Sequence, residues 1–401
     1  MKQSGDFGRG RTILLLCSLA LMLPLAGGTL SRALAQGKDK QEDSIYKQLS
    51  VFTEVLSLIR RNYVDETELG GLFAGALDGT VDALDPLATY VPPERIAVYH
   101  AARQVGRSHS GVAVARQRGI TYVLAVEPSS PGAEAELAAG DILSEIDGRS
   151  TREMSLWEVE SLLAGEPGTE LELKTLRRGQ TLESQLRLAS FERHGSALEL
   201  RDDLVVITIP RFEEGLAGEL ETLLAQASGR DRMLIDLRGA AGGTAESAFR
   251  SAAHFVQGSL GKLLGREGTI TEFADEKVPE WNGRMVVLTD RSSQGASEVF
   301  AAVLVQAAGA ELVGERTFGH AGRRAIITLS NGAEIHFSDA FYAGPDGAAI
   351  DSPLMPKLVV SEVSRRLSEA DVPFAELMMR RAIERLLSEP LAAEEAAEAA
   401  A

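Results

Sequence analysis

The stretch "LTDRSSQGASEVFAAVL", Leu288 to Leu304, contains the end of an apolar strand, a polar turn and the start of a long apolar helix. A turn of this kind presents a side chain at a helix N-terminus, where the helix dipole favours negative charge. Ser292 and Ser293 precede the expected helix and Ser297 lies at its start, yet the centre of the turn is Gly295. The stretch therefore builds a place for a nucleophile and raises the question of whether one is present.

Residues 204–360 around this turn alternate apolar strand segments with helical segments. The expected strands are "LVVITI", "MLIDL", "MVVLT", "ELVGE", "AIITL" and "EIHFS", and the expected helices cover 213–228, 244–256 and 296–308. This alternation predicts an α/β core with a partly parallel sheet. Sites in such sheets form where strands end and loops lead into helices.

A second loop of this kind is "DLRGAAGGTAES", Asp236 to Ser247. Its glycines, Gly242 and Gly243, leave backbone N–H groups free to face an incoming oxygen near a helix N-terminus. The N–H of Ala296 occupies the same place in the first turn. We expect these three N–H groups to act as oxyanion-type donors.

The segment from about 106 to 190 has short strands separated by Gly and Pro turns. Within it, "PSSPGAEAELAAGDILSEIDGRS" (Pro128–Ser150) resembles the PDZ domain, which binds a peptide as an added strand and holds a terminal carboxylate in a backbone nest. The resemblance puts the nest and strand in "SHSGVAV", with the expected contacts Ser110, Gly111, Val112, Ala113 and Val114. Gly111 would allow close approach to the ligand. The alternative is another small β-rich domain with a glycine turn.

The two ends of the chain have distinct compositions. Residues 1–35 have a basic start, an apolar run and a small-x-small site ending at Ala35, which predicts a cleaved signal peptide. An uncleaved anchor is the alternative. Residues 36–44 are a polar linker, residues 45–104 form a helical domain with an apolar stripe, and residues 387–401 are an acidic, alanine-rich tail.

Composition excludes several functions. The net charge of −17 argues against nucleic acid as a partner, because such binding needs a basic surface. Removal of the signal peptide would also remove Cys17, the only cysteine, and with it disulfide chemistry. The six histidines show no HxxxH or HxH spacing, so we expect neither a metal site nor a cofactor.

The chain from Tyr46 to Val360 resembles the carboxyl-terminal processing peptidases, also called tail-specific proteases. The matching motifs, in order, are "LDPLATYVPPE", the PDZ stretch, "DLRGAAGG", "DRSSQGASEVFAAVL", "ELVGERTFGHAGR" and "FYAGPDG". The resemblance implies an α+β multidomain protein with a helical N-terminal segment, a PDZ domain (105–190) and a crotonase-like α/β core (191–386). It also implies an exported peptidase that recognises C-terminal residues of unstructured polypeptides and uses a serine, a lysine and a glutamine.

The catalytic side chains do not transfer to this sequence. The serine position, two residues before the "SE" of the turn, is Gly295, and the lysine position after Phe-Gly is His320. The glutamine position is Arg324, and the asparagine usual in the first glycine loop is Ala240. Only the expected oxyanion donors remain, because they belong to the backbone.

Three functions remain open at this stage. The first is a pseudopeptidase that binds extended peptides or protein C-termini, or assembles with an active relative or an envelope adaptor. The second is an active serine endopeptidase in which Ser293 has become the nucleophile and His320 its base. The third is a structural envelope protein that binds no peptide.

Overall fold

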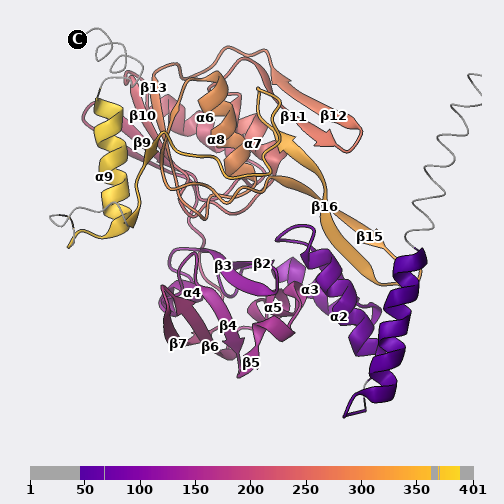
Figure 1. Ribbon diagram of the computed structural model, residues 1–401. Helices are drawn as coiled ribbons and strands as arrows, with labels where there is room; N and C mark the ends of the chain where they lie inside the picture. Colours follow the sequence, from indigo (N-terminus) through magenta and orange to yellow (C-terminus); the bar gives the residue numbers. More distant parts are fainter. Residues whose placement is uncertain (1–45, 67, 363–368, 370, 389–401) are drawn as a thin grey trace, which may run out of the picture. The chain divides into compact units, whose positions relative to one another are not determined.

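The computed structural model describes residues 46–66, 68–362, 369 and 371–388 (Figure 1). The chain divides into two units, Met1–Gly75 and Ala76–Ala401, which are described separately. The expected signal peptide, the linker and the tail beyond residue 388 lie outside the described residues. None of the described helices is both long enough and apolar enough to span a membrane.

In the first unit, residues 46–62 form the helix that the apolar stripe predicts. Phe52 lies against Phe73, with ring centroids 6.0 Å apart. Phe73 belongs to α2 (Leu69–Asp82), which runs across the boundary between the units. Other apolar side chains of the first helix, including Leu49 and Leu58, are about half exposed.

The PDZ-like part of the second unit is a sheet in the order β2-β3-β4-β6-β7, with β5 paired to β4. Its strands are β2 (Val112–Gln117), β3 (Ile120–Val126), β4 (Ile142–Ile146), β5 (Arg149–Ser150), β6 (Glu170–Arg177) and β7 (Gln180–Arg187). The helices α4 (Pro131–Glu134) and α5 (Leu156–Leu163) complete it. Buried Leu143, Ile146, Leu156 and Leu173 form its core, and β2 is an edge strand.

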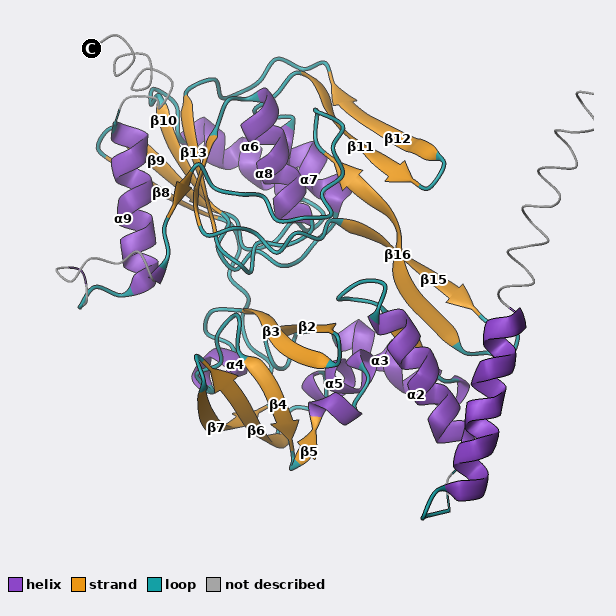
Figure 2. Cartoon of the chain, in the orientation of Figure 1, coloured by secondary structure: helices purple, strands orange, loops and turns teal. Residues whose placement is uncertain are grey.

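A six-stranded sheet in the order β17-β14-β13-β10-β9-β8 forms the α/β core (Figure 2). The strands are β8 (Ala197–Arg201), β9 (Leu204–Thr208), β10 (Arg232–Asp236), β13 (Arg284–Thr289), β14 (Glu311–Gly314) and β17 (Leu358–Val359). All neighbours are parallel except β8, which is antiparallel to β9. The partly parallel sheet is therefore confirmed.

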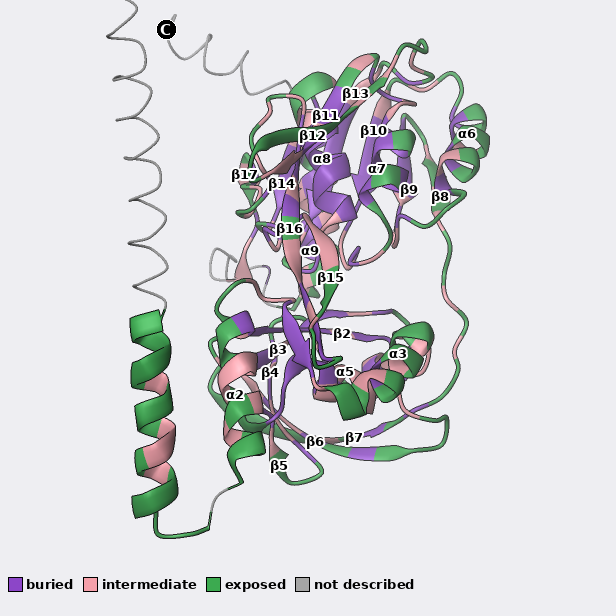
Figure 3. Ribbon diagram, turned by 90° about the vertical axis from the view of Figure 1, so that its right-hand side faces the viewer, coloured by how far each residue is buried: buried purple, intermediate pink, exposed green. Residues whose placement is uncertain are grey.

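Successive residues of these strands face opposite helical layers, as side-chain alternation requires. Val205, Ile207 and Ile235 share a core with α6 (Leu216–Gln226), α7 (Ala245–Ala252) and α8 (Ala296–Ala307). Their neighbours Leu204, Val206 and Leu234 pack with α9 (Phe374–Leu387) on the other face. The first nine residues of α8 are buried, which explains its continuous apolar sequence (Figure 3).

A second sheet, antiparallel at every pairing, has the order β1-β16-β11-β12, with β15 paired to β16. It comprises β1 (Thr89–Val91), β11 (Gly258–Gly265), β12 (Gly268–Asp275), β15 (Gly322–Thr328) and β16 (Glu334–Ala343). The expected helical domain 45–104 is divided here. Strand β1 pairs with β16, and the next helix, α3 (Ile96–Val105), also belongs to the second unit.

The predicted fold class, a mixed α+β multidomain protein, is confirmed. Strands β10 and β13 are parallel neighbours, with Asp236 opposite Leu288. Both strands therefore end at the same edge of the sheet, and the glycine loop and the turn before α8 lie side by side. Helix α8 begins at Ala296, as the sequence predicts.

Candidate functional site

Gly295 occupies the N-cap of α8 with φ 64° and ψ −107°. Residues other than glycine adopt this backbone conformation only with strain. A Cβ added here would have the carbonyl oxygen of His320 as its nearest neighbour, at 4.0 Å. The turn therefore has room for a side chain, in a strained conformation, and carries none.

A buried carboxylate, Glu298, joins this turn to the loop after β14. One oxygen accepts from the Thr317 hydroxyl at 2.5 Å and the Gly319 N–H at 2.6 Å. The other accepts from the N–H groups of Gly295 and His320, at 2.9 and 3.0 Å. Burial raises the pKa of Glu298, and the four donors oppose that rise. The positions aligned with the family's serine and lysine are thus brought together by one side chain.

The serines beside Gly295 have structural partners. The Ser293 hydroxyl donates to the Leu237 carbonyl at 2.9 Å, and the Ser297 hydroxyl donates to the Ala240 carbonyl at 2.8 Å. Both residues are fully buried. Within the described part of the chain, no contact joins the side chains of Ser293 and His320. The structure therefore does not assemble the alternative pair considered above.

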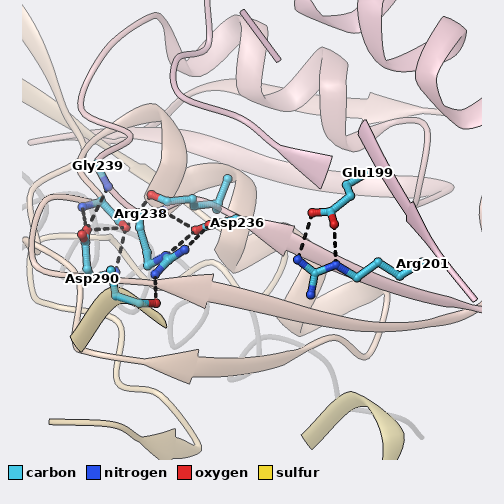
Figure 4. A network of polar contacts seen from close by, with 9 residues as sticks. Glu199, Arg201, Asp236, Arg238, Gly239 and Asp290 are labelled. Atoms are coloured by element: carbon cyan, nitrogen blue, oxygen red, sulfur yellow. Dashed lines mark hydrogen bonds and ion pairs between the residues drawn. The ribbon is translucent and has the colours of Figure 1, made fainter. Parts of the chain in front are cut away.

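Asp290 organises the base of the turn (Figure 4). Its carboxylate accepts from the N–H groups of Gly239, Ser292 and Ser293, at 3.1, 2.9 and 3.1 Å. Burial raises the pKa of Asp290. Arg238, also in Figure 4, pairs with Asp236 at 2.6 Å. The Asp290 carboxylate therefore joins the end of β13 to the loop after β10, whereas the Asp236–Arg238 pair lies within the end of β10.

The expected oxyanion donors lie in the glycine loop and at the start of α8. The N–H groups of Gly242, Gly243 and Ala296 have no acceptor among the residues that the structure describes. Gly243 has φ 96°, and a Cβ there would lie 2.0 Å from the Phe212 carbonyl oxygen, so only glycine fits. Ala240, the asparagine position, is fully buried and accepts from the Gln294 N–H at 3.1 Å.

His320 lies beside the turn, but its ring has other partners. Its Nε2 contacts the Ser338 Oγ at 3.0 Å and lies 3.7 Å from Asp85 Oδ1. Burial, and to a lesser degree Arg324, lowers the pKa of His320, so the ring is neutral near pH 7. Serine and aspartate face the same ring nitrogen. The Ser338–His320 pair therefore lacks the arrangement of a catalytic triad, in which a carboxylate accepts from the other ring nitrogen, Nδ1.

Arg324 does not replace the glutamine. Its Nη2 donates to the Leu87 carbonyl at 2.8 Å and to the Tyr99 hydroxyl at 3.4 Å. Its Nε is buried without a partner among the described residues. No hydrogen bond joins it to His320 in the described chain, and a guanidinium cannot accept one.

A cavity of about 270 Å³ connects the PDZ-like groove with this site. The side of β2 contributes Val112, Ala113 and Val114, and α5 contributes Glu160 and Leu163. The remaining lining includes Arg103 from the end of α3, Arg107 from the turn after it, and Ala241, Gln294 and Arg324 from the core. The cavity thus extends from β2 to Gln294, the residue before Gly295.

The expected carboxylate nest is partly occupied by the protein itself. The N–H of Gly111 donates to the Arg107 carbonyl at 2.8 Å, and that of Val112 contacts the Ser110 Oγ at 3.3 Å. Gly111 has φ 71°, and a Cβ would lie 2.1 Å from the Ser130 Cβ. Glycine is therefore required for internal packing, whereas the sequence suggested ligand approach.

A larger cavity, of about 660 Å³, lies against the loop after β14. Its lining includes Tyr122, Phe318 and His320, together with Arg291 and Arg316. Burial raises the pKa of Tyr122 to about 12, so the side chain remains a neutral phenol.

One cluster was missed by the sequence analysis. His100, Glu334 and His336 bring three potential metal-ligating atoms within 4.8 Å of one another. Histidine spacing in the sequence indicates only ligands that are close along the chain. Here a Glu-x-His pair on β16 meets a histidine 234 residues from Glu334.

The fold and the site define a PDZ-containing protein built on a serine-peptidase core. Residues 203–360 match peptidase family S41, and residues 122–177 match the PDZ domain. Together, these two matches support a member of the carboxyl-terminal processing peptidase family.

Sequence similarity to known proteases extends over most of the chain. A carboxy-terminal-processing protease of Bartonella bacilliformis is 24% identical, covering 84% of this chain and 81% of the relative. The carboxy-terminal processing protease CtpA of Bacillus subtilis is also 24% identical, covering 82% and 71%. Among solved structures, a photosystem II D1 C-terminal processing protease has the same fold, with a TM-score of 0.65 and 21% identity over 84% of this chain and 97% of that one.

Proposed function

We propose that this protein is an exported pseudopeptidase, which binds extended peptides or protein C-termini without hydrolysing them. The observation that carries the proposal is Gly295. It occupies the N-cap where a nucleophile would face the free N–H groups, and it has no hydroxyl. Export is inferred from the signal-peptide pattern of residues 1–35.

The loss of chemistry follows from the roles of the missing groups. An acyl-enzyme needs a hydroxyl within reach of a base, and no adjustment of the backbone supplies an oxygen to glycine. Removal of the nucleophile from such a unit costs on the order of 10⁶ in turnover, even where oxyanion donors remain. Ser293 and Ser297 cannot compensate readily, because both hydroxyls donate to buried carbonyls.

Binding is supported by the groove beside β2. Strand β2 has no neighbouring strand on one side, so its Val112–Val114 end can receive an extended segment through backbone hydrogen bonds, whereas the Arg116 N–H already donates to the Pro86 carbonyl at 2.8 Å. Arg103, Arg107 and Arg324 line the adjoining cavity against a single carboxylate, Glu160. This excess of positive charge favours an anionic group, such as the terminal carboxylate of a protein.

Hydrolysis is tested with purified protein lacking residues 1–35 and an unfolded protein substrate that ends in apolar residues. Mass spectrometry would detect fragments after hours of incubation. The triple variant Gly295→Ser, His320→Lys and Arg324→Gln is run in parallel. We expect no fragments from the natural protein; cleavage by the triple variant would show that only the side chains are missing. Fragments from the natural protein would contradict the proposal.

Peptide binding is tested by filling the cavity. Ala102 lines it from α3, whereas the adjacent Ala101 is exposed. We expect Ala102→Phe to weaken binding of a fluorescent peptide at least about tenfold and Ala101→Phe to leave it unchanged. The same peptide with an amidated C-terminus should bind more weakly. Absence of binding by the natural protein would favour a structural envelope protein instead.

A second candidate function, an active hydrolase, is favoured by one contact. Ser338 Oγ lies 3.0 Å from the His320 ring, so a different serine–histidine pair exists. If the natural protein cuts, loss of cleavage in Ser338→Ala would identify this pair. Loss in Ser293→Ala would instead identify the pair suggested by the sequence.

A further inference from the structure

We propose that His100, Glu334 and His336 form a binding site for a divalent transition-metal ion of the Zn²⁺ class, between helix α3 and strand β16. The proposal concerns a different cluster of side chains from the peptide site and does not depend on peptide binding.

The geometry suits such an ion. Glu334 Oε2 lies 2.8 Å from His100 Nε2 and 3.0 Å from His336 Nε2. In a tetrahedral zinc site with bonds of about 2.0–2.1 Å, ligand atoms are about 3.4 Å apart. An opening of a few tenths of an ångström at each contact would therefore admit the ion. Two imidazoles and a carboxylate are a common ligand set for zinc.

The surroundings provide both a scaffold and an entry path. The His336 side chain is fully buried and that of Glu334 is 11% exposed, whereas that of His100 is 49% exposed. Two ligands are thus fixed on β16, and the third can move with the surface of α3. The exposed side leaves a fourth coordination position for water, as sites with three protein ligands have.

Arg103 competes with a metal ion for His336 through a hydrogen bond. Its Nη1 lies 3.3 Å from His336 Nδ1, which must accept the hydrogen bond because guanidinium only donates. The ring proton is then on Nε2, the atom that a metal would need. Metal binding therefore requires Arg103 to withdraw and the proton to move to Nδ1. Arg103 is exposed and able to withdraw, so it and the metal compete for one histidine.

The test is a Zn²⁺ titration of the full chain, without a histidine tag and after treatment with a chelator, by calorimetry. We expect one ion per chain. His100→Ala and His336→Ala should each weaken binding at least about tenfold. His254→Ala is the matched control. His254 also contacts a glutamate, Glu280, at 3.1 Å but belongs to no three-residue cluster in the described chain.

Two further features keep the test decisive. If His336→Ala does not fold, His100→Ala at the surface still reports on the site. Arg103→Leu should tighten Zn²⁺ binding several-fold, because it removes the competitor while leaving all three ligands. The proposal is overturned if Zn²⁺ does not bind, or if binding is equal in the natural protein and in His100→Ala. In either case the cluster is only a hydrogen-bond network.

Discussion

The groove beside β2 and the turn before α8 adjoin at Gln294, yet they depend on different atoms. The groove offers the backbone edge of a strand and a lining whose overall charge matters more than any one side chain. The turn offers backbone N–H groups too, but its chemistry would need one hydroxyl oxygen, which Gly295 lacks. Binding through backbone groups can survive substitutions that end covalent catalysis. We therefore expect peptide binding and catalysis to be separable in this protein.

The largest effect is expected where the framework of the turn is removed. Glu298→Ala would leave four buried donors, including the Gly295 and His320 N–H groups, without their acceptor. We expect the free energy of unfolding to fall by about 3–5 kcal/mol, measured by chemical denaturation. Glu214→Ala, at an exposed position, should change it by less than about 0.5 kcal/mol. Equal effects would refute the structural role of Glu298.

The next largest effect is expected in the glycine loop. There, Gly243 is needed because a Cβ would clash with backbone, whereas a Cβ on Gly242 would meet only side chains. Gly243→Ala would place a Cβ 2.0 Å from the Phe212 carbonyl. We expect a loss of about 2–4 kcal/mol. Gly242→Ala would meet the end of the long Arg107 side chain at 2.6 Å, rather than backbone, and should cost about 1 kcal/mol or less. Equal stability of the two variants would contradict the requirement for glycine at position 243.

The main features of the α/β core and of the turn before α8 were predictable from sequence. Apolar alternation and glycine turns predicted the parallel strands and the exact start of α8 at Ala296, because both signals are local. The family resemblance located Gly295, His320 and Arg324, and the structure brings the first two together through Glu298.

Other features were not predictable, because they depend on contacts between distant residues. Strand β1 lies in a segment expected to be helical and pairs with β16 far along the chain. The partners of Ser293 and the internal use of the Gly111 N–H are likewise set by packing. So is the meeting of His100 with β16.

A smaller effect is expected when a hydroxyl is restored at position 295 without any other change. Gly295→Ser fits the available space, but its φ of 64° should cost about 1–3 kcal/mol of stability. Gly218→Ser, in α6 and also with open space, has no positive φ and should be near neutral. Peptide affinity should be unchanged in both, measured by fluorescence anisotropy. A large loss of affinity in Gly295→Ser alone would mean that the turn and the groove are not separable.

The smallest effect concerns pH. Burial lowers the pKa of His320; Asp85 and Asp351 oppose this and Arg324 adds to it. The unfolded chain, with an ordinary histidine pKa of about 6.5, therefore takes up the proton first as pH falls. The stability linked to His320 is fully present above that pKa and is lost as pH decreases. Denaturation at pH 7 and pH 5 should show the natural protein losing on the order of 1 kcal/mol more than His320→Asn. An equal loss in both would mean that His320 has the same pKa in the folded and unfolded chain. Its ring could then still serve as a base at the turn.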